Sequence, residues 1–205
     1  MNKKNCLTLA FALLLLSSIQ AQEKAFDIVA GAVYPIQTSA KSASTKPKTG
    51  LTFGLLYRRK NEKGDQWSVG AEYQLLQSKS KVLLNNVEET QTEKFEMFHL
   101  RGCPLVWLLG KKKQVFVEAG VFVNYLLHEE TELKRDLVNN TKLLQRTSAG
   151  PSLGFGVQLG QSLRKSIIFG LRDDFGAVSF GKKPNGSKAK ALKFNTISLY
   201  VGLGI

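Results

Sequence analysis

Eight segments of the chain alternate apolar and polar side chains with a period of two, and the connections between them alternate between short and long. Period two is typical of β-strands, whose successive side chains point to opposite faces. The segments are 26–34, 50–59, 66–77, 95–108, 114–126, 147–159, 166–175 and 193–205. The short connections are 60–65, 109–113 and 160–165, and the long ones are 36–49, 78–94, 127–146 and 176–192. An antiparallel meander with this alternation places all its long loops at one end.

The polarity of the two strand faces distinguishes a water-soluble barrel from a membrane barrel. In segment 114–126 the apolar stripe runs without a break from Val115 to Tyr125, while the opposite stripe contains Glu118, Gly120 and Asn124. A soluble barrel turns its apolar stripe inward, whereas a membrane barrel turns it toward lipid and keeps polar groups in the lumen. An unpaired charge in a dry core would cost several kcal/mol. The pattern therefore predicts an all-β, eight-stranded, antiparallel, up-and-down transmembrane β-barrel of the outer-membrane type.

Aromatic residues near the strand ends favour the same interpretation, because tyrosine and tryptophan concentrate at both membrane interfaces. Tyr57, Trp67 and Trp107 adjoin short turns, and Tyr34, Tyr73 and Tyr125 lie toward the long loops. In segment 95–108 we expect Phe98, Leu100 and Val106 on the lipid face, opposite His99, Arg101 and Cys103.

The first 21 residues have the pattern of a cleaved signal peptide. Lys3 and Lys4 precede an apolar run from Leu7 to Leu16, and Ala21 ends a stretch of small residues suited to cleavage. The apolar run is about half the length that a membrane-spanning helix requires. We therefore expect a signal peptide at 1–21, a barrel domain at 22–205 and export to the outer membrane. Loss of the two leader lysines reduces the net charge from +13 to +11.

The second half of the chain carries motifs that resemble a known family. Arg101-Gly-Cys-Pro104, Gly-Lys-Lys-Lys and Val115-Phe-Val-Glu118-Ala-Gly120 occupy its centre. Ser152-Leu-Gly-Phe-Gly156, Gly170-Leu-Arg172 and Thr196-Ile-Ser-Leu-Tyr200-Val-Gly202 follow. Together they resemble the PorT-like outer-membrane β-barrel family of Bacteroidetes, small eight-stranded barrels similar to OmpA. The resemblance covers most of the mature chain, and it implies a role accessory to secretion or assembly.

Charged residues on the inward stripes predict a network of ion pairs inside the barrel. Glu72 and Arg101 fall on adjacent strands, with Glu118 on the next strand. Arg172 and Asp174 lie on the seventh segment, from which a side chain can cross a narrow lumen. An eight-stranded barrel encloses only enough room for side chains, so we expect no general pore.

Lysines in the first and fourth long loops predict a basic surface patch, since these loops are neighbours if the last strand pairs with the first. The patch comprises Lys41, Lys46, Lys48, Lys182, Lys183, Lys188 and Lys190. It suits anionic partners such as lipopolysaccharide phosphates or acidic polysaccharide, with solvated loop charge as the equal alternative. Lys79, Lys81 and Lys94 are expected to matter less because acids adjoin them in the sequence. The absence of interleaved aromatics argues against nucleic acid.

No motif indicates a metal, a nucleotide or another cofactor, and neither His99 nor His128 belongs to a ligand cluster. We expect a structural, adhesive or accessory protein that is not an enzyme. Two alternatives remain open. One is a secreted soluble barrel that binds a small apolar ligand, and the other is a lipid-modifying barrel enzyme that uses His128 and Ser148 at the rim.

Overall fold

The structure is a computed structural model that describes residues 23–37, 46–60, 66–84, 87–109, 114–133, 136–139, 146–160, 162–176 and 194–205. The predicted signal peptide and the domain boundary after residue 21 lie outside these residues and stay predictions. Throughout the described segments, no helix is both long enough and apolar enough to cross a membrane.

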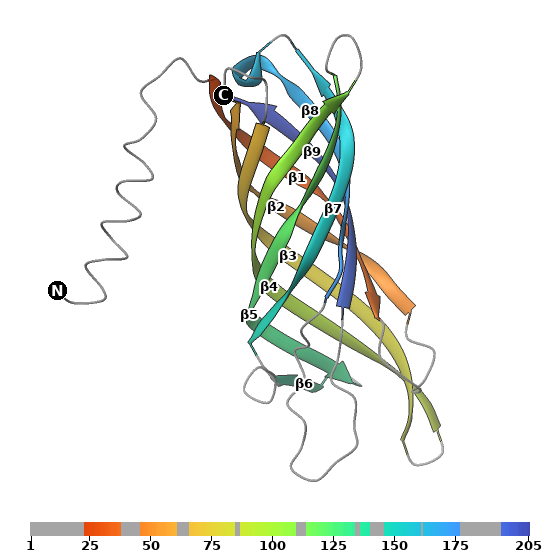
Figure 1. Ribbon diagram of the computed structural model, residues 1–205. Coiled ribbons are helices and arrows are strands. Elements are labelled where there is room, and N and C mark those ends of the chain that lie inside the picture. The colour runs from red at the N-terminus through yellow and green to blue at the C-terminus, as the bar shows by residue number, and fades with distance from the viewer. Residues whose placement is uncertain are drawn as a thin grey trace, which may run out of the picture.

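Eight long antiparallel strands form a single closed barrel, and a ninth short strand lies at one end of it (Figure 1). The wall strands are β1 (Glu23–Gln37), β2 (Lys46–Lys60), β3 (Gln66–Leu84), β4 (Val87–Leu109), β5 (Val115–Leu133), β7 (Thr147–Leu159), β8 (Ile167–Asp174) and β9 (Phe194–Gly204). The short strand is β6 (Asp136–Asn139), and the 3-10 turn η1 (Leu163–Lys165) connects β7 to β8.

The barrel closes because the last strand pairs with the first. β9 lies antiparallel to β1 from the Asp27–Gly204 pair to the Gln37–Phe194 pair. β4 pairs with β5, so the wall contains no unpaired edge strand between them. The predicted eight-stranded antiparallel barrel is confirmed, with β6 as an addition to the outer end of β5.

Five strands, β1 to β5, run further toward the long-loop end than the sequence predicted. The segment 78–94, predicted as a long loop, is mostly a continuation of β3 and β4, and β5 continues from Leu127 to Leu133. These extensions pair in register, for example Val82 with Glu89. Their sequence shows no alternation of apolar with polar residues, because a strand beyond the apolar belt has polar surroundings on both sides. Backbone hydrogen bonds hold the ladder without that alternation.

A β-bulge in β4 overturns the prediction for Val106. The register shifts between Gly102 and Leu105, so β4 has one more residue there than β5. Pro104, which has no N–H to donate to a ladder, lies in this irregular stretch. Val106 is consequently buried beside Cys103 inside the barrel, whereas Phe98 and Leu100 face outward as expected.

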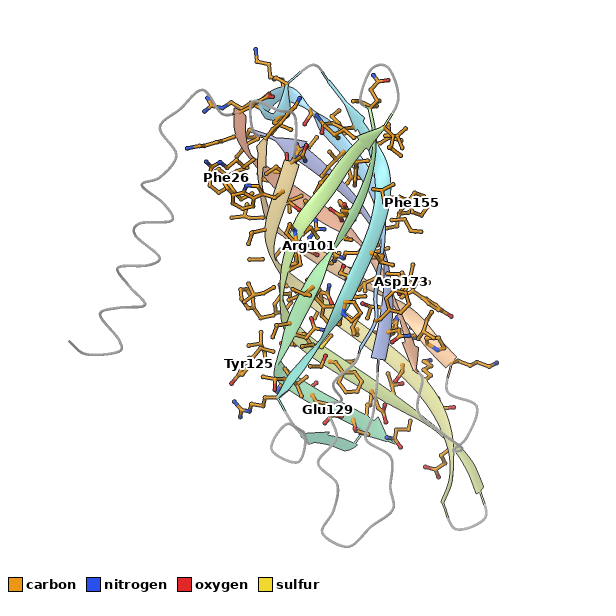
Figure 2. All side chains as sticks on the ribbon, in the orientation of Figure 1. Phe26, Arg101, Tyr125, Glu129, Phe155 and Asp173 are labelled. Carbon is orange, nitrogen blue, oxygen red and sulfur yellow. The ribbon has the colours of Figure 1, made fainter. Side chains whose placement is uncertain are left out.

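The outer wall is apolar and the inner wall is polar. Figure 2 shows Phe26 and Phe155 projecting away from the wall, whereas the side chain of Arg101 lies within the outline of the barrel. The apolar residues that are more than half exposed include Phe26, Ile28, Leu51, Phe53, Leu55, Val121, Leu153, Phe155, Leu199 and Leu203. Buried charged residues include Asp27, Arg58, Glu72, Arg101, Glu118, Arg172 and Asp174. This inversion is the arrangement of a membrane barrel.

Aromatic residues at the short-turn end form a continuous contact across three strands. The ring centroids of Phe26 and Tyr57 are 5.0 Å apart, and those of Tyr57 and Trp67 are 5.5 Å apart. The guanidinium of Arg59 lies 5.9 Å from the centre of the Trp67 ring. At the other end, Tyr34 and Tyr125 are exposed on the outer wall. Such bands suit the two interfaces of a bilayer.

We expect the folded protein to resist SDS at room temperature and to change its gel mobility on boiling. The closed wall pairs its backbone groups internally, so detergent has no strand edge at which to begin unfolding. The measurement is SDS gel electrophoresis of membrane-extracted protein, with and without boiling. Identical mobility under both conditions would contradict the closed barrel.

Candidate functional site

The centre of the lumen holds an ion-pair network formed by the five residues that the sequence predicted to face inward. We call Glu72, Arg101, Glu118, Arg172 and Asp174 the central network. Arg172 donates from Nη1 to Glu72 Oε1 at 2.8 Å and from Nη2 to Glu72 Oε2 at 2.9 Å. Its Nε donates to Asp174 Oδ2 at 3.1 Å. Glu72 on β3 and Arg172 on β8 are thus joined across the lumen by a two-pronged contact, the strongest arrangement for this pair.

Arg101 on β4 joins the remaining acid to the same network. Its Nη1 donates to Glu118 Oε1 at 2.6 Å, and its Nε lies 3.3 Å from Glu72 Oε1. Tyr200 on β9 donates its hydroxyl to Glu118 at 3.2 Å. Both guanidinium groups also lie over the Tyr200 ring, at 5.3 Å for Arg101 and 5.6 Å for Arg172. Both guanidinium groups also approach Glu72 Oε1, and this shared carboxylate offsets the repulsion between the two like charges.

Polar side chains that sequence reasoning did not assign complete the central network. Thr52 donates to Glu72 Oε2 at 2.8 Å, and Ser152 donates to Asp174 Oδ1 at 2.5 Å. His99 Nδ1 lies 2.6 Å from Asn124 Oδ1, and His99 Nε2 lies 3.8 Å from Asp174. All four lie on inward stripes, which was visible in the sequence. Their partners depend on strand register and barrel diameter, which were not.

A second ionic cluster lies at the short-turn end of the lumen. Arg58 on β2 binds Asp27 on β1 through both Nε and Nη2, and Nη1 donates to Gln158 Oε1 at 2.8 Å. Nη2 also donates to Ser166 Oγ at 2.7 Å and to the Leu163 carbonyl at 3.2 Å. This cluster therefore ties the turn η1 to the barrel wall and covers the end of the lumen.

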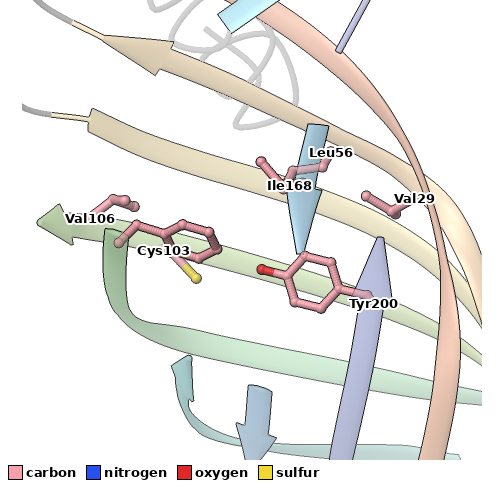
Figure 3. Close-up of a cluster of buried hydrophobic side chains, with 7 residues drawn as sticks. Val29, Leu56, Cys103, Val106, Ile168 and Tyr200 are labelled. Atoms are coloured by element: carbon pink, nitrogen blue, oxygen red, sulfur yellow. The ribbon is translucent and has the colours of Figure 1, made fainter. Parts of the chain in front are cut away.

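Apolar layers alternate with the ionic clusters along the barrel axis. The first layer, shown in Figure 3, contains Val29, Leu56, Cys103, Val106, Phe116, Ile168 and Tyr200. The second consists of Val33, Leu76, Phe95, Met97 and Leu126. An interior cavity beside Tyr200 and Arg58 has a volume of about 10 Å³, roughly the space of one water molecule. The lumen is filled by side chains at these levels.

Beyond the second apolar layer, carboxylates line the inner side of the strand extensions. Glu93 accepts from Ser78 Oγ at 3.1 Å and from Gln91 at 3.0 Å. Burial raises the pKa of Glu93, and the nearby charge of Glu129 raises it further. Glu89 and Glu129 are also buried at this level. These acids face the inside of the extended barrel wall, whereas Lys79 and Lys94 lie on its outer side.

The lysines of the predicted basic patch are only partly described. Lys41, Lys182, Lys183, Lys188 and Lys190 lie outside the described residues. Lys46 and Lys48 belong to strand β2, where the sequence predicted a loop, and both are exposed. In register they adjoin Lys79 and Gln77 on β3, and Gln77 in turn pairs with Lys94 on β4. The two lysines therefore lie beside Lys79 and Lys94, a neighbourhood that the sequence did not predict.

His128 and Ser148, the pair considered for catalysis, face opposite sides of the wall. Ser148 is buried in the lumen at the start of β7. His128 is half-buried on the outer side of β5, and its Nε2 lies 2.8 Å from Glu130 Oε1. This carboxylate raises the pKa of His128, which favours a charged imidazole. Within the described residues, no group of three or more histidine, cysteine or acidic side chains is arranged to hold a metal ion.

Comparisons with known proteins agree with this architecture. No family model matches the chain, and no curated protein matches it either. Neisserial surface protein A (NspA) superposes with a TM-score of 0.50 at 14% identity, covering 87% of this chain and 96% of that one. The chain has the fold of a small outer-membrane β-barrel. The resemblance to the PorT-like family stays a prediction from its motifs.

Two further solved structures are similar at lower scores. One is Ail, the attachment invasion locus protein of Yersinia pestis, which was solved in complex with the heparin analogue sucrose octasulfate. Ail superposes on this chain with a TM-score of 0.43 at 14% identity, covering 90% of this chain and 99% of that one. The outer membrane protein OprG from Pseudomonas aeruginosa has a TM-score of 0.44 at 15% identity, covering 89% of this chain and 96% of that one.

Proposed function

We propose that the protein is an integral outer-membrane barrel that neither conducts solutes nor catalyses a reaction, and that it acts through contacts made by its strand extensions outside the cell. The observation that carries this proposal is the continuation of β3, β4 and β5 as a paired ladder beyond the apolar belt. Long-loop ends of such barrels face outward from the cell. A paired ladder is a firmer platform for contacts than a free loop, because its backbone is already ordered.

The filled lumen favours a barrel whose interior is blocked over both a pore and a soluble carrier of a small ligand. A carrier of a small apolar ligand would need an interior cavity of several hundred Å³. Among the described residues, the lumen has a cavity of about 10 Å³ beside Tyr200. A hollow of about 390 Å³ lies at the bulge of β4, but it is bordered by Val69 and Val121, which are exposed on the outer wall. The central network and the Asp27–Arg58 cluster fill the lumen on either side of the layer that contains Tyr200. The exposed apolar belt further favours lipid as the surroundings of this barrel.

Reconstituted protein is expected to give no stable conductance in planar lipid bilayers, because water and ions find no continuous path past the central network. The measurement is single-channel recording, with a general porin as the positive control. Steady openings comparable to those of the porin would contradict the closed lumen.

The contact role is tested by trimming the β3–β4 extension. Residues 80–91 would be replaced by a two-residue Asn-Gly turn, which suits a hairpin and leaves the belt intact. Cells that display the trimmed protein are expected to adhere less to surfaces than cells that display the full chain, with the same heat-dependent gel shift for both. Equal adherence would contradict the adhesive role. The role accessory to secretion, which rests on the PorT-like resemblance, would then be the alternative.

The proposal that the protein is not an enzyme is supported by the placement of His128 and Ser148. A nucleophile needs its base within hydrogen-bond reach, and the barrel wall separates these two side chains. Purified protein is expected to release no fatty acid from phospholipid vesicles. Lipid turnover that disappears in a His128→Ala variant would restore the enzyme interpretation.

A further inference from the structure

Lysines from three neighbouring strands, β2, β3 and β4, gather on the outer side of the wall just past the apolar belt. On β3 the outward side chains run from Trp67 at the short-turn end to Leu75, and then to Gln77 and Lys79. Trp67 to Leu75 is a span of about nine residues, close to the length of a membrane-crossing strand. Lys79 lies four residues further, roughly 14 Å along the strand. With a strand tilt of roughly 40°, Lys79 comes to the depth of the lipid head groups.

The strand register places the lysines in two adjacent rows. The first row contains Lys48, Gln77 and Lys94, and the second contains Lys46, Lys79 and Thr92. The neighbouring charges of Lys79 and Lys94 lower the pKa of Lys48, with Lys79 contributing more. Like charges held this close repel one another, and an anionic partner would relieve that repulsion.

The acidic groups near these lysines lie either at the edge of the lysine group or on the inner face of the strands. Lys94 is 3.7 Å from Glu132 on β5, and Glu96 pairs with Leu75 in the row nearest the belt. Glu93 points inward to Ser78. Among the described residues, no carboxylate lies within ion-pair distance of Lys46, Lys48 or Lys79. The positive charge on β2 and β3 is therefore not neutralised by the described part of the chain.

We propose that Lys46, Lys48 and Lys79, with Lys94 at the edge, bind the phosphate groups of outer-leaflet lipid A. This inference rests on the proposed membrane placement, which sets the depth of the lysines. Several ammonium groups at head-group depth attract phosphate mainly by charge. Their flexible apolar stems let the ammonium groups reach phosphates at slightly different heights. A lipid partner is favoured over a polysaccharide because the lysines lie on the lateral wall beside the belt, where lipid is the neighbour.

The test compares two triple variants with equal loss of charge. One is Lys46→Gln/Lys48→Gln/Lys79→Gln, and its control at the opposite end of the barrel is Lys24→Gln/Lys60→Gln/Lys165→Gln. Each protein would be titrated in detergent with phosphorylated lipid A and with dephosphorylated lipid A, and binding measured by native mass spectrometry. Wild type and the control are expected to prefer the phosphorylated lipid by at least tenfold. The first variant is expected to lose most of that preference.

Three outcomes would overturn the proposal: equal loss in both variants, no loss in the first, or equal binding of the two lipids by wild type. Stronger binding of a soluble acidic polysaccharide to the same lysines would also overturn it in favour of that partner. The heat-dependent gel shift and insertion into vesicles are measured on the same samples. Failure of those two readouts would count against the membrane barrel itself, so the two failures are distinguishable.

Discussion

Glu72→Ala is expected to lower the free energy of unfolding by about 3–5 kcal/mol, the largest effect of any single substitution that we propose. Glu72 accepts hydrogen bonds from Arg172 and Thr52 and lies 3.3 Å from Arg101 Nε. Its removal leaves two buried guanidinium groups to share Glu118 and Asp174. The measurement is urea unfolding of the protein in lipid vesicles, followed by tryptophan fluorescence.

Glu132→Ala is the matched control, because Glu132 also faces an opposite charge but at the surface. Its side chain and that of Lys94 are 46% and 44% exposed, at a distance of 3.7 Å. Exposed pairs of this kind contribute at most about 1 kcal/mol. Similar urea midpoints for Glu72→Ala and Glu132→Ala would show that the central network does not stabilise the barrel.

A double variant tests whether the Arg172–Asp174 pair stabilises the barrel. Replacing Arg172 by Met together with Glu72→Ala removes an acid and a base at once. This variant should be less stable than Glu72→Ala alone, because Asp174 keeps its Arg172 partner in the single variant and loses it in the double variant. A double variant as stable as Glu72→Ala, or more stable, would mean that the Arg172–Asp174 pair does not stabilise the barrel.

Val201→Arg is expected to destabilise the protein by about 2–4 kcal/mol in a bilayer, as charged residues do on the lipid face near the midplane. Val201 is exposed on β9 between Ala30 on β1 and Phe169 on β8. In a water-soluble barrel an exposed valine would accept arginine with little change. The result therefore discriminates the membrane barrel from the secreted soluble alternative.

The control for Val201→Arg adds the same charge beyond the belt. Thr90 is exposed on the extension of β4, and Thr90→Arg should leave the stability in vesicles within about 0.5 kcal/mol of wild type. Equal stability of wild type, Val201→Arg and Thr90→Arg would contradict the placement of β9 against lipid.

Sequence reasoning predicted the fold class well and the strand ends poorly, for the same physical reason. Between the two interfaces, each strand separates lipid from lumen, so its alternation is strong and local. Past the belt, both faces of β3 and β4 meet polar surroundings, and the alternation disappears while the pairing continues. The bulge at Gly102–Leu105 likewise leaves no periodic mark, so Val106 was assigned to the wrong face.

Away from the bulge at Gly102–Leu105, the sequence by itself determined which residues of the belt face inward, because the alternation along a single strand encodes that choice. It placed Glu72 and Arg172 on polar stripes without any knowledge of their separation. Only the tertiary structure decided that they meet across the lumen, 100 residues apart in the chain. The tertiary structure likewise placed Lys46 and Lys48 beside Lys79, and His128 and Ser148 on opposite sides of the wall. Such contacts depend on strand register and barrel closure, which arise from the pairing of all eight strands together.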